Sequence, residues 1–436
     1  MKRWLAVFGL VLTASACASP ISTKTTQEKL SPGAYRIWLG DGFNRSTPMT
    51  VVDGSGKILR TLPQGTAASD WSRLYTIERR SDPPLLLALD PASGDVIIRV
   101  QVPYVFDFTQ GPFLGDRPSG LSPNNAWIVL QSLDRKGAQS GTVERSHYLV
   151  IDKDFKSPAR KVDLKGYWEY DGLSNDGNSL FLLQYVSQPP QPIEYHVRRY
   201  DLAAGQLVLG TIVDKREGPE AMSGLRVHSI PTPDGSWLYS LYINDGKGPF
   251  IHALSLGTDP IACCIDLPSK GIDFEKQLLW SMAMTPDGSR AYAVNAGTGE
   301  VYEIAVTSSG PPTITRAARF PVSKHQSFDW FGLVINAEAK RIVFGGAALS
   351  PDAKTLYAIG EDSVYAIDTT KLTLKGHYLA GHALGSLALS QDGGALFAAG
   401  AGDGKVLRLD TVTWAQSEIT INNSRGVTIV RVQSGS

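Results

Sequence analysis

Short runs of residues with apolar side chains at alternate positions recur along the chain after residue 33. The segment 355–359, Thr-Leu-Tyr-Ala-Ile, is one example, and many of these runs are rich in Val, Ile, Tyr and Phe. Apolar positions with a period of two predict a β-strand that buries one face. The pattern therefore predicts an all-β fold made of many short strands.

A repeated turn motif separates pairs of these runs. It begins with an apolar residue or Pro, followed by Ser or Thr, and ends in Asp or Asn and then Gly or a small residue. Pro presets φ, Asp hydrogen-bonds back to the backbone, and Gly accepts a positive φ, so the motif predicts a tight turn. Residues 69–72 are a degraded copy. The better copies are 121–125, 173–177, 231–235, 284–288, 349–353 and 389–393.

A third run that ends in Asp, a second turn and a fourth run often follow the motif. Residues 364–368, with the run from Thr373, show this arrangement. The motif resembles the PD40 and YVTN-type repeats of the WD40-like β-propellers, over nearly the whole chain after residue 33. The resemblance implies one all-β domain, residues 34–432, a single β-propeller of four-stranded antiparallel blades.

The phases of the repeats predict eight blades. Three N-terminal runs, 35–39, 49–52 and 57–62, lack an innermost strand, and residues 426–430 at the C-terminal end are the candidate to supply it. Such a clasp would close the ring and remove two free strand edges. Seven blades are the alternative, in which the N-terminal runs only complete the last blade.

The N-terminal segment predicts export. Lys2 and Arg3 precede an apolar run, residues 4–12, which is too short to span a bilayer, and small residues follow as far as Ala16. Residues 1–16 are therefore predicted to be a signal peptide. Cys17 follows, and this arrangement resembles the bacterial lipobox, in which that cysteine is lipidated. The alternative is an ordinary signal-peptidase site.

The resemblance to the lipobox implies a lipid anchor at Cys17, with residues 17–33, rich in Ser, Thr and Lys, as a flexible tether. The expected location is the cell envelope, with the membrane as a partner through the anchor. Of the three cysteines, the other two, Cys263 and Cys264, are adjacent. We expect them to be two small apolar residues in a strand.

The charge balance gives no electrostatic argument for nucleic-acid binding. Lys and Arg together number 42, as do Asp and Glu, so the formal net charge is zero. A nucleic-acid-binding protein usually has a basic excess on one face. We therefore expect no nucleic-acid partner.

Candidate binding residues lie on one predicted face of the propeller. If the strands of a blade are named a to d from the axis outward, the b–c and d–a connections share a face, and several are long. Near them, aromatic rings stand beside carboxylates, which suits stacking on a sugar or holding a peptide. The alternative is that the rings pack between blades and the acids bond backbone amides. The candidates are Phe106, Asp107, Phe108, Trp168, Glu169, Tyr170, Asp171, Asp273, Phe274, His325, Phe328, Asp329 and Trp330.

Motifs for catalysis or metal binding are not found in the sequence. The seven histidines form no H-E-x-x-H motif, and no G-x-S-x-G occurs. We predict no catalytic residue, no metal site and no cofactor. The first hypothesis is a membrane-anchored, non-enzymatic binding or scaffolding lipoprotein for a protein, peptide or glycan ligand. The alternative is an enzyme, because propellers with similar repeats include metal-dependent lactonases and quinoprotein dehydrogenases.

Overall fold

The computed structural model describes residues 35–434 apart from 42–46, 104, 110–119, 137–140, 188–193, 215–219, 245–247, 270–272, 308–310, 323–344, 401–403 and 422–426. The predicted signal peptide, Cys17 and the tether lie outside the described residues. None of the helices in the described part is long and apolar enough to cross a membrane. The only described helix is the single turn α1 (Phe274–Gln277).

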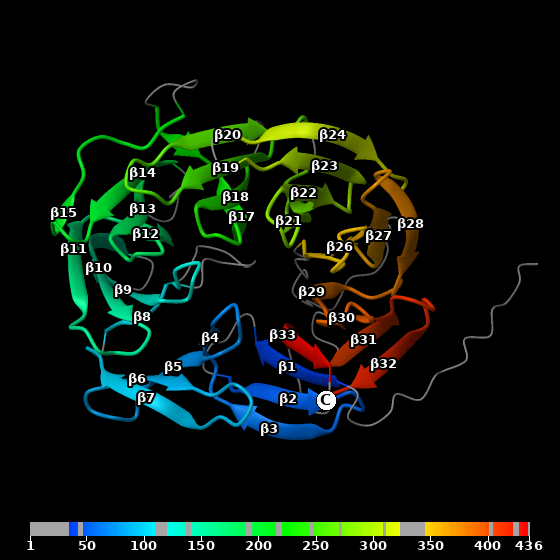
Figure 1. Cartoon of the computed structure of the whole chain (residues 1–436), viewed down its shortest axis with the longest axis horizontal. Helices are drawn as coiled ribbons and strands as arrows, with labels where there is room; N and C mark the ends of the chain where they lie inside the picture. Colours follow the sequence, from blue (N-terminus) through cyan, green and yellow to red (C-terminus); the bar gives the residue numbers. More distant parts are fainter. Residues whose placement is uncertain are drawn as a thin grey trace, which may run out of the picture.

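Eight antiparallel sheets stand around a ring, each with one edge strand nearest the axis (Figure 1). From the inner to the outer strand, blade 1 consists of β33 (Val427–Ser434), β1 (Tyr35–Asp41), β2 (Met49–Asp53) and β3 (Ile58–Leu62), and blade 2 of β4 (Thr66–Ala67), β5 (Leu74–Glu78), β6 (Leu85–Leu89) and β7 (Val96–Gln101). Blade 3 consists of β8 (Asp107–Phe108), β9 (Trp127–Lys136), β10 (Thr142–Asp152) and β11 (Arg160–Lys165). Blade 4 consists of β12 (Trp168–Leu173), β13 (Ser179–Tyr185), β14 (Glu194–Asp201) and β15 (Gln206–Leu207). In blade 4, β16 (Met222–Ser223) also pairs with β14.

Blades 5 to 8 have the same order. Blade 5 consists of β17 (Leu225–Pro231), β18 (Trp237–Ile243), β19 (Phe250–Ser255) and β20 (Ala262–Asp266), and blade 6 of β21 (Trp280–Met284), β22 (Arg290–Asn295), β23 (Glu300–Ala305) and β24 (Thr313–Arg319). Blade 7 consists of β25 (Ala347–Leu349), β26 (Thr355–Ile359), β27 (Val364–Asp368) and β28 (Thr373–Tyr378). Blade 8 consists of β29 (Leu384–Leu389), β30 (Ala395–Gly400), β31 (Lys405–Asp410) and β32 (Gln416–Thr420). The chain is an eight-bladed β-propeller, which confirms the predicted fold.

The ring closes between the two ends of the chain. The C-terminal strand β33 pairs antiparallel with the N-terminal strand β1, with Tyr35 opposite Ser434 and Asp41 opposite Val427 (Figure 1). This pairing gives blade 1 its innermost strand, as the sequence predicted. Because both strands would otherwise expose free edges, the pairing protects the ring from edge-to-edge association. Eight blades are therefore confirmed, and seven are excluded.

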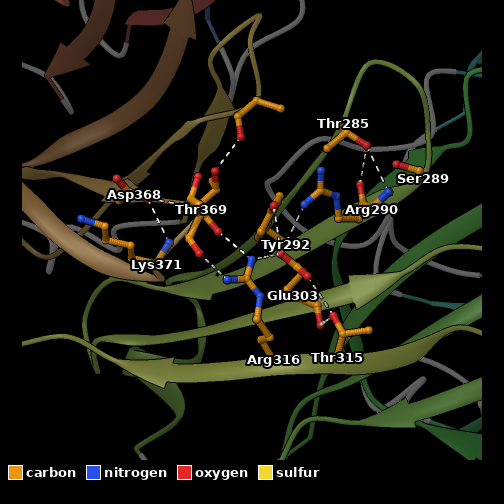
Figure 2. Close-up of polar contacts among 12 residues, drawn as sticks. Thr285, Ser289, Arg290, Tyr292, Glu303, Thr315, Arg316, Asp368, Thr369 and Lys371 are labelled. Atoms are coloured by element: carbon orange, nitrogen blue, oxygen red, sulfur yellow. Dashed lines mark hydrogen bonds and ion pairs between the residues drawn. The ribbon is translucent and has the colours of Figure 1, made fainter.

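The turn motif makes the same hydrogen bonds in each blade where it is intact. In blade 6, Thr285 Oγ1 donates to Asp287 Oδ1 over 2.6 Å, and the amide of Ser289 donates to the same oxygen over 3.0 Å. The amide of Arg290 donates to Thr285 Oγ1 over 3.1 Å, and Gly288 has a φ of 70° (Figure 2). Equivalent hydroxyl–acid bonds join Ser174 to Asp176, Thr232 to Asp234, Ser350 to Asp352 and Ser390 to Asp392.

The degraded copy is the equivalent turn of blade 2. Ala68 stands where the hydroxyl residue would be, so the bonds of that hydroxyl are lost, while the amide and the hydroxyl of Ser72 still donate to Asp70 Oδ1 over 3.0 and 2.7 Å. Trp71 takes the positive φ, 58°, that Gly has elsewhere. The turn geometry therefore survives without half of its side-chain bonds.

The core is divided among the seams between successive blades. At the seam of blades 4 and 5, Phe181 and Leu183 pack against Leu238 and Leu254, all fully or almost fully buried. Cys263 and Cys264 are buried residues of strand β20, as expected. In the b–c connection of blade 3, β9 continues to Lys136 and β10 begins at Thr142.

Candidate functional site

The segment 106–108 is split between the core and the surface. The rings of Phe106 and Phe108 are buried in the seam of blades 2 and 3. The Asp107 carboxylate is about half exposed and pairs with Arg79, whose Nη2 lies 2.7 Å away. The same nitrogen donates to the carbonyl of Phe106. Asp107 and Arg79 therefore present one accessible ion pair on the face of the b–c and d–a connections.

The segment 168–171 is buried. Trp168, Glu169, Tyr170 and Asp171 form most of strand β12, and none is more than 4% exposed. Their rings pack in the core, as the alternative interpretation predicted for the aromatic residues. Both acids accept hydrogen bonds from the side chains of other residues. A ligand resting on the surface would not contact these four side chains, and their proposed binding role stays a prediction.

The remaining candidates lie elsewhere. Asp273 is the N-cap residue of α1, although its side chain makes no capping hydrogen bond, and Phe274 is 43% exposed beside it. His325, Phe328, Asp329 and Trp330 lie outside the described residues. Among the predicted ligand-binding residues, Asp107, Asp273 and Phe274 are thus described side chains that a surface ligand can reach.

The buried acids belong to a polar cluster at the seam of blades 4 and 5. Asp171 Oδ1 accepts from Arg226 Nη1 over 2.7 Å, and Arg226 Nη2 donates to the carbonyl of Tyr170 over 3.2 Å. Both charged side chains are at most 5% exposed. Burial alone would lower the pKa of Arg226, but nearby Tyr242 and Asp171 raise it, so the guanidinium remains charged. The ion pair joins the innermost strands of the two blades.

Glu169 is held by two tyrosines in the same cluster. The hydroxyl of Tyr185 donates to Glu169 Oε2 over 2.9 Å, and that of Tyr167 donates to Oε1. The two rings are stacked with their centroids 4.8 Å apart. Burial, and next the Glu169 charge, raise the pKa of both phenols well above the usual value. These tyrosines therefore act as neutral donors.

A histidine and a cysteine lie at the outer end of the cluster. His252 Nδ1 is 3.8 Å from Cys264 Sγ, and the amide of Cys264 donates to Asp214 Oδ2 over 2.8 Å. Burial lowers the pKa of His252, so its imidazole is neutral at physiological pH. Asp214 caps an outward-facing amide of β20, the outermost strand of blade 5, and so protects that edge.

A cavity of about 540 Å³ opens at the outer rim beside this edge. Its walls come from residues 208–214 of blade 4 and 258–263 of blade 5, with Arg199 and Pro311. Asp214 and Cys263 belong to its lining, and Leu209 at its margin is 96% exposed. Its size and mainly apolar walls suit a small amphipathic ligand. Among the described residues, no three His, Cys, Asp or Glu side chains are grouped as a metal would need.

A second polar cluster links blades 6 and 7 (Figure 2). Arg316 pairs with Glu303 and also donates to the carbonyls of Thr369 and Thr370 in the next blade. Burial raises the pKa of Glu303, but hydrogen bonds from Arg316 and Thr315 outweigh it and lower the pKa overall. Because Arg316 bonds both to Glu303 of its own blade and to carbonyls of the next, this cluster ties the two blades together.

No local pattern in the sequence predicts the roles of Arg226 and His252. Arg226 lies in the alternating run Leu225-Arg226-Val227-His228, which is typical of a strand. Its partner Asp171 is 55 positions earlier in the chain. Only the order of the blades brings the two together. Once eight blades are assumed, Arg226 falls on an innermost strand, and a charged residue at such a position indicates a buried partner.

The described residues form an eight-bladed β-propeller with polar clusters at two of its seams, a rim cavity and one face of loops. No protein-family model and no curated protein matches the chain. Among solved structures, the chain is similar to apo AztD from Citrobacter koseri, with 12% identity and a TM-score of 0.52, covering 92% of this chain and 99% of that one.

Two other structures are similar at lower scores. The periplasmic gluconolactonase PpgL of Pseudomonas aeruginosa has 16% identity and a TM-score of 0.43, covering 85% of this chain and 98% of that one. The dihydro-heme d1 dehydrogenase NirN in complex with DHE has 12% identity and a TM-score of 0.47, covering 87% of this chain, which spans 66% of that one. At such identities the likeness concerns the fold alone.

Proposed function

We propose that this protein is an exported, lipid-anchored binding protein whose propeller presents the face of its b–c and d–a connections to a protein, peptide or glycan. The export signal and Cys17 support the location. The contrast between the two faces supports the binding role. It is the observation on which the proposal rests.

On the face of the a–b turns, the turns of neighbouring blades form hydrogen bonds with one another. The amide of Asn124 donates to Asn175 Oδ1 over 3.0 Å, and Asn175 Nδ2 donates to the carbonyl of Asp234 over 2.9 Å, so the turns of three successive blades are joined. Their polar groups are used within the protein.

The opposite face offers groups that a partner can use. Val105, Val186 and Phe274 are 65%, 56% and 43% exposed in its connections, and the half-exposed pair of Asp107 and Arg79 lies on the same face. Exposed apolar side chains beside polar groups are typical of recognition surfaces, and loops on a rigid scaffold often carry them. We refer to these residues as the loop face.

The anchor is tested by the mass of the mature protein. Diacylglycerol on Cys17 is expected in protein extracted from membranes, and Cys17→Ser should release the chain into the soluble fraction of the envelope. A mature protein that begins elsewhere, or that carries no lipid, would contradict the anchor.

The loop face is tested by binding to glycan and peptide arrays. Asp107→Asn with Phe274→Ser should reduce the signal of any bound probe about tenfold or more. The matched control is Val412→Ser, which removes an 80% exposed side chain on the other face of the ring. Equal binding by the parent and the loop-face variant would show that the face is wrongly assigned.

The enzymatic alternative, a metal-dependent lactonase-like hydrolase or a quinoprotein-type dehydrogenase, stays a prediction. The described residues give it no observation of its own. Metal analysis of the purified protein is its direct test, because stoichiometric calcium or zinc would favour the hydrolase.

A further inference from the structure

The outermost strands of most blades expose polar side chains. In β11 the exposed positions are Lys161, Asp163 and Lys165, which alternate with more buried residues. In β28 they are Thr373 and Lys375, followed by His377. Exposed charges on an outer strand keep its free edge from pairing with another chain.

Blades 1 and 2 differ. In β3, Ile58 and Leu59 are 50% and 42% exposed, and in β7, Val96 and Ile97 are 53% and 50% exposed. Among the outermost strands in the described part of the chain, β3 and β7 alone contain large apolar side chains this exposed. Single exposed apolar residues are common, but a group of four on neighbouring strands points to an interaction surface. We call these four residues the rim patch.

The rim patch lies on one side of the ring. All outermost strands run from the c–d turn to the d–a connection, so the first residues of β3 and β7 are on the same side. The two strands are neighbours along the rim (Figure 1). Gly94, just before β7, approaches Leu62 of β3 so closely that an added Cβ would lie 2.7 Å from Leu62 Cδ2. This contact joins the c–d turn of blade 2 to Leu62, the buried last residue of β3, so the two strands that carry the patch lie on adjoining blades.

Basic side chains surround the rim patch. Lys57, Arg60 and Arg99 are exposed in or next to the two strands, while Asp95 is the exposed acid beside Val96. Aliphatic side chains with a cationic surround are the composition that binds anionic lipid headgroups. The apolar groups enter the boundary with the acyl chains, and the cations contact phosphates.

The position of Cys17 in the sequence would place a lipid anchor on the same side of the ring as the rim patch. Strand β1 of blade 1 begins at Tyr35 on the side of the a–b and c–d turns, and Cys17 precedes it through residues 18–34. A flexible tether of that length spans roughly 20 to 25 Å between its ends. A lipid on Cys17 would therefore hold the rim patch within reach of the bilayer and raise its effective concentration there.

We propose that the rim patch docks the propeller on the anionic phospholipid surface to which the chain is anchored. The biological setting rests on the proposed function, because it assumes the anchor, but the affinity of the patch for lipid does not. Docking on this side would direct the loop face away from the membrane, towards a partner.

The test is flotation of the full mature chain carrying Cys17→Ser with lipid vesicles. The unlipidated chain should bind phosphatidylcholine vesicles containing about one third phosphatidylglycerol more strongly than phosphatidylcholine alone, and salt should weaken this binding. Ile58→Ser with Ile97→Ser should lower the partition coefficient about tenfold or more. Lys57→Gln with Arg99→Gln should remove most of the preference for phosphatidylglycerol.

The matched control is Leu209→Ser, which removes an even more exposed side chain on blade 4. It should float like the parent. Equal flotation of the rim-patch variant and the parent would overturn the proposal, as would equal losses in the control. If the patch variant instead converts a dimer to a monomer without changing flotation, the occupant is a second copy and the proposal fails. A chain that floats but carries no lipid in the cell would contradict the anchor alone.

Discussion

Two seams of the propeller close the same kind of gap with different side chains. Between blades 7 and 8, aliphatic residues such as Ile359, Leu396 and Leu407 dominate the contact, and all are at most 3% exposed. Between blades 4 and 5, leucines and rings are joined by the buried pair of Asp171 and Arg226. Since both seams hold neighbouring blades in the same relation, burying charge is not required for the fold.

The difference indicates what the ion pair contributes. Two buried charges lose their hydration, and their attraction in the interior often only offsets that cost, so the pair need not add net stability. Removing one partner, however, leaves an uncompensated charge. We therefore expect the polar seam to be sensitive to single substitutions and tolerant of a balanced double one.

The largest expected effect is that of Asp171→Ala. It leaves Arg226 buried and without its carboxylate, so the free energy of unfolding should fall by about 3 to 5 kcal/mol. Urea unfolding followed by tryptophan fluorescence measures the change. Asp171→Leu combined with Arg226→Met should recover most of the loss. A double variant as unstable as the single one would mean that the pair itself stabilises the seam.

Leu396→Ala makes the matching change in the aliphatic seam. Leu396 is fully buried, so the substitution leaves a cavity, and unfolding should be easier by about 2 to 4 kcal/mol. Leu396→Met, which keeps the volume, should cost less than about 1.5 kcal/mol. The contrast between the two seams would be contradicted if Leu396→Ala lowered the free energy of unfolding as much as Asp171→Ala. The contradiction would also require that neither Leu396→Met nor the double variant Asp171→Leu with Arg226→Met recover the loss.

The turns above the aliphatic seam give a smaller effect. Gly393 has a φ of 72°, and a Cβ there would lie 2.7 Å from Pro351 Cδ in the neighbouring turn. Gly205 has a φ of 67° with nothing within 4 Å, so Gly205→Ala is the control for backbone strain alone. Gly205→Ala should cost about 1 kcal/mol, and Gly393→Ala should cost measurably more in the same unfolding assay. Equal losses of unfolding free energy in the two variants would show that the neighbouring turns are not in close contact.

The comparison also shows which features the sequence predicts. Strand alternation and the turn motif are local, so they predicted the blades, and the unpaired runs at both ends predicted the clasp. The seam contacts are not local. The sequence predicts Asp171 as a candidate binding residue because it lies near a d–a connection beside aromatic residues, features that a buried innermost strand shares. Its burial depends on Arg226, in another blade. The sequence alone does not predict the rim patch, because Ile58 and Val96 are ordinary strand residues until their position on an outermost strand is known.

The smallest expected effect is a pH dependence that both seams share. Hydrogen bonds, above all from Thr285, lower the pKa of Asp287 from 3.8 to about 2, and the pKa values of Asp234 and Asp392 are also lowered by their turns. Because the folded pKa is below the unfolded one, this stabilisation is complete above pH about 4 and is lost as the pH falls towards about 2. Urea midpoints measured across that interval should therefore decline.

Thr232→Ala at the polar seam and Ser390→Ala at the aliphatic seam should each reduce this decline by a similar amount, since each removes the hydroxyl that binds its aspartate. Asp53, whose pKa is lowered within a different turn, should keep its share in both variants. If only Thr232→Ala changed the slope, the contrast between the two seams would extend from their cores to their turns. The turn motif would then not act as an independent unit repeated around the ring.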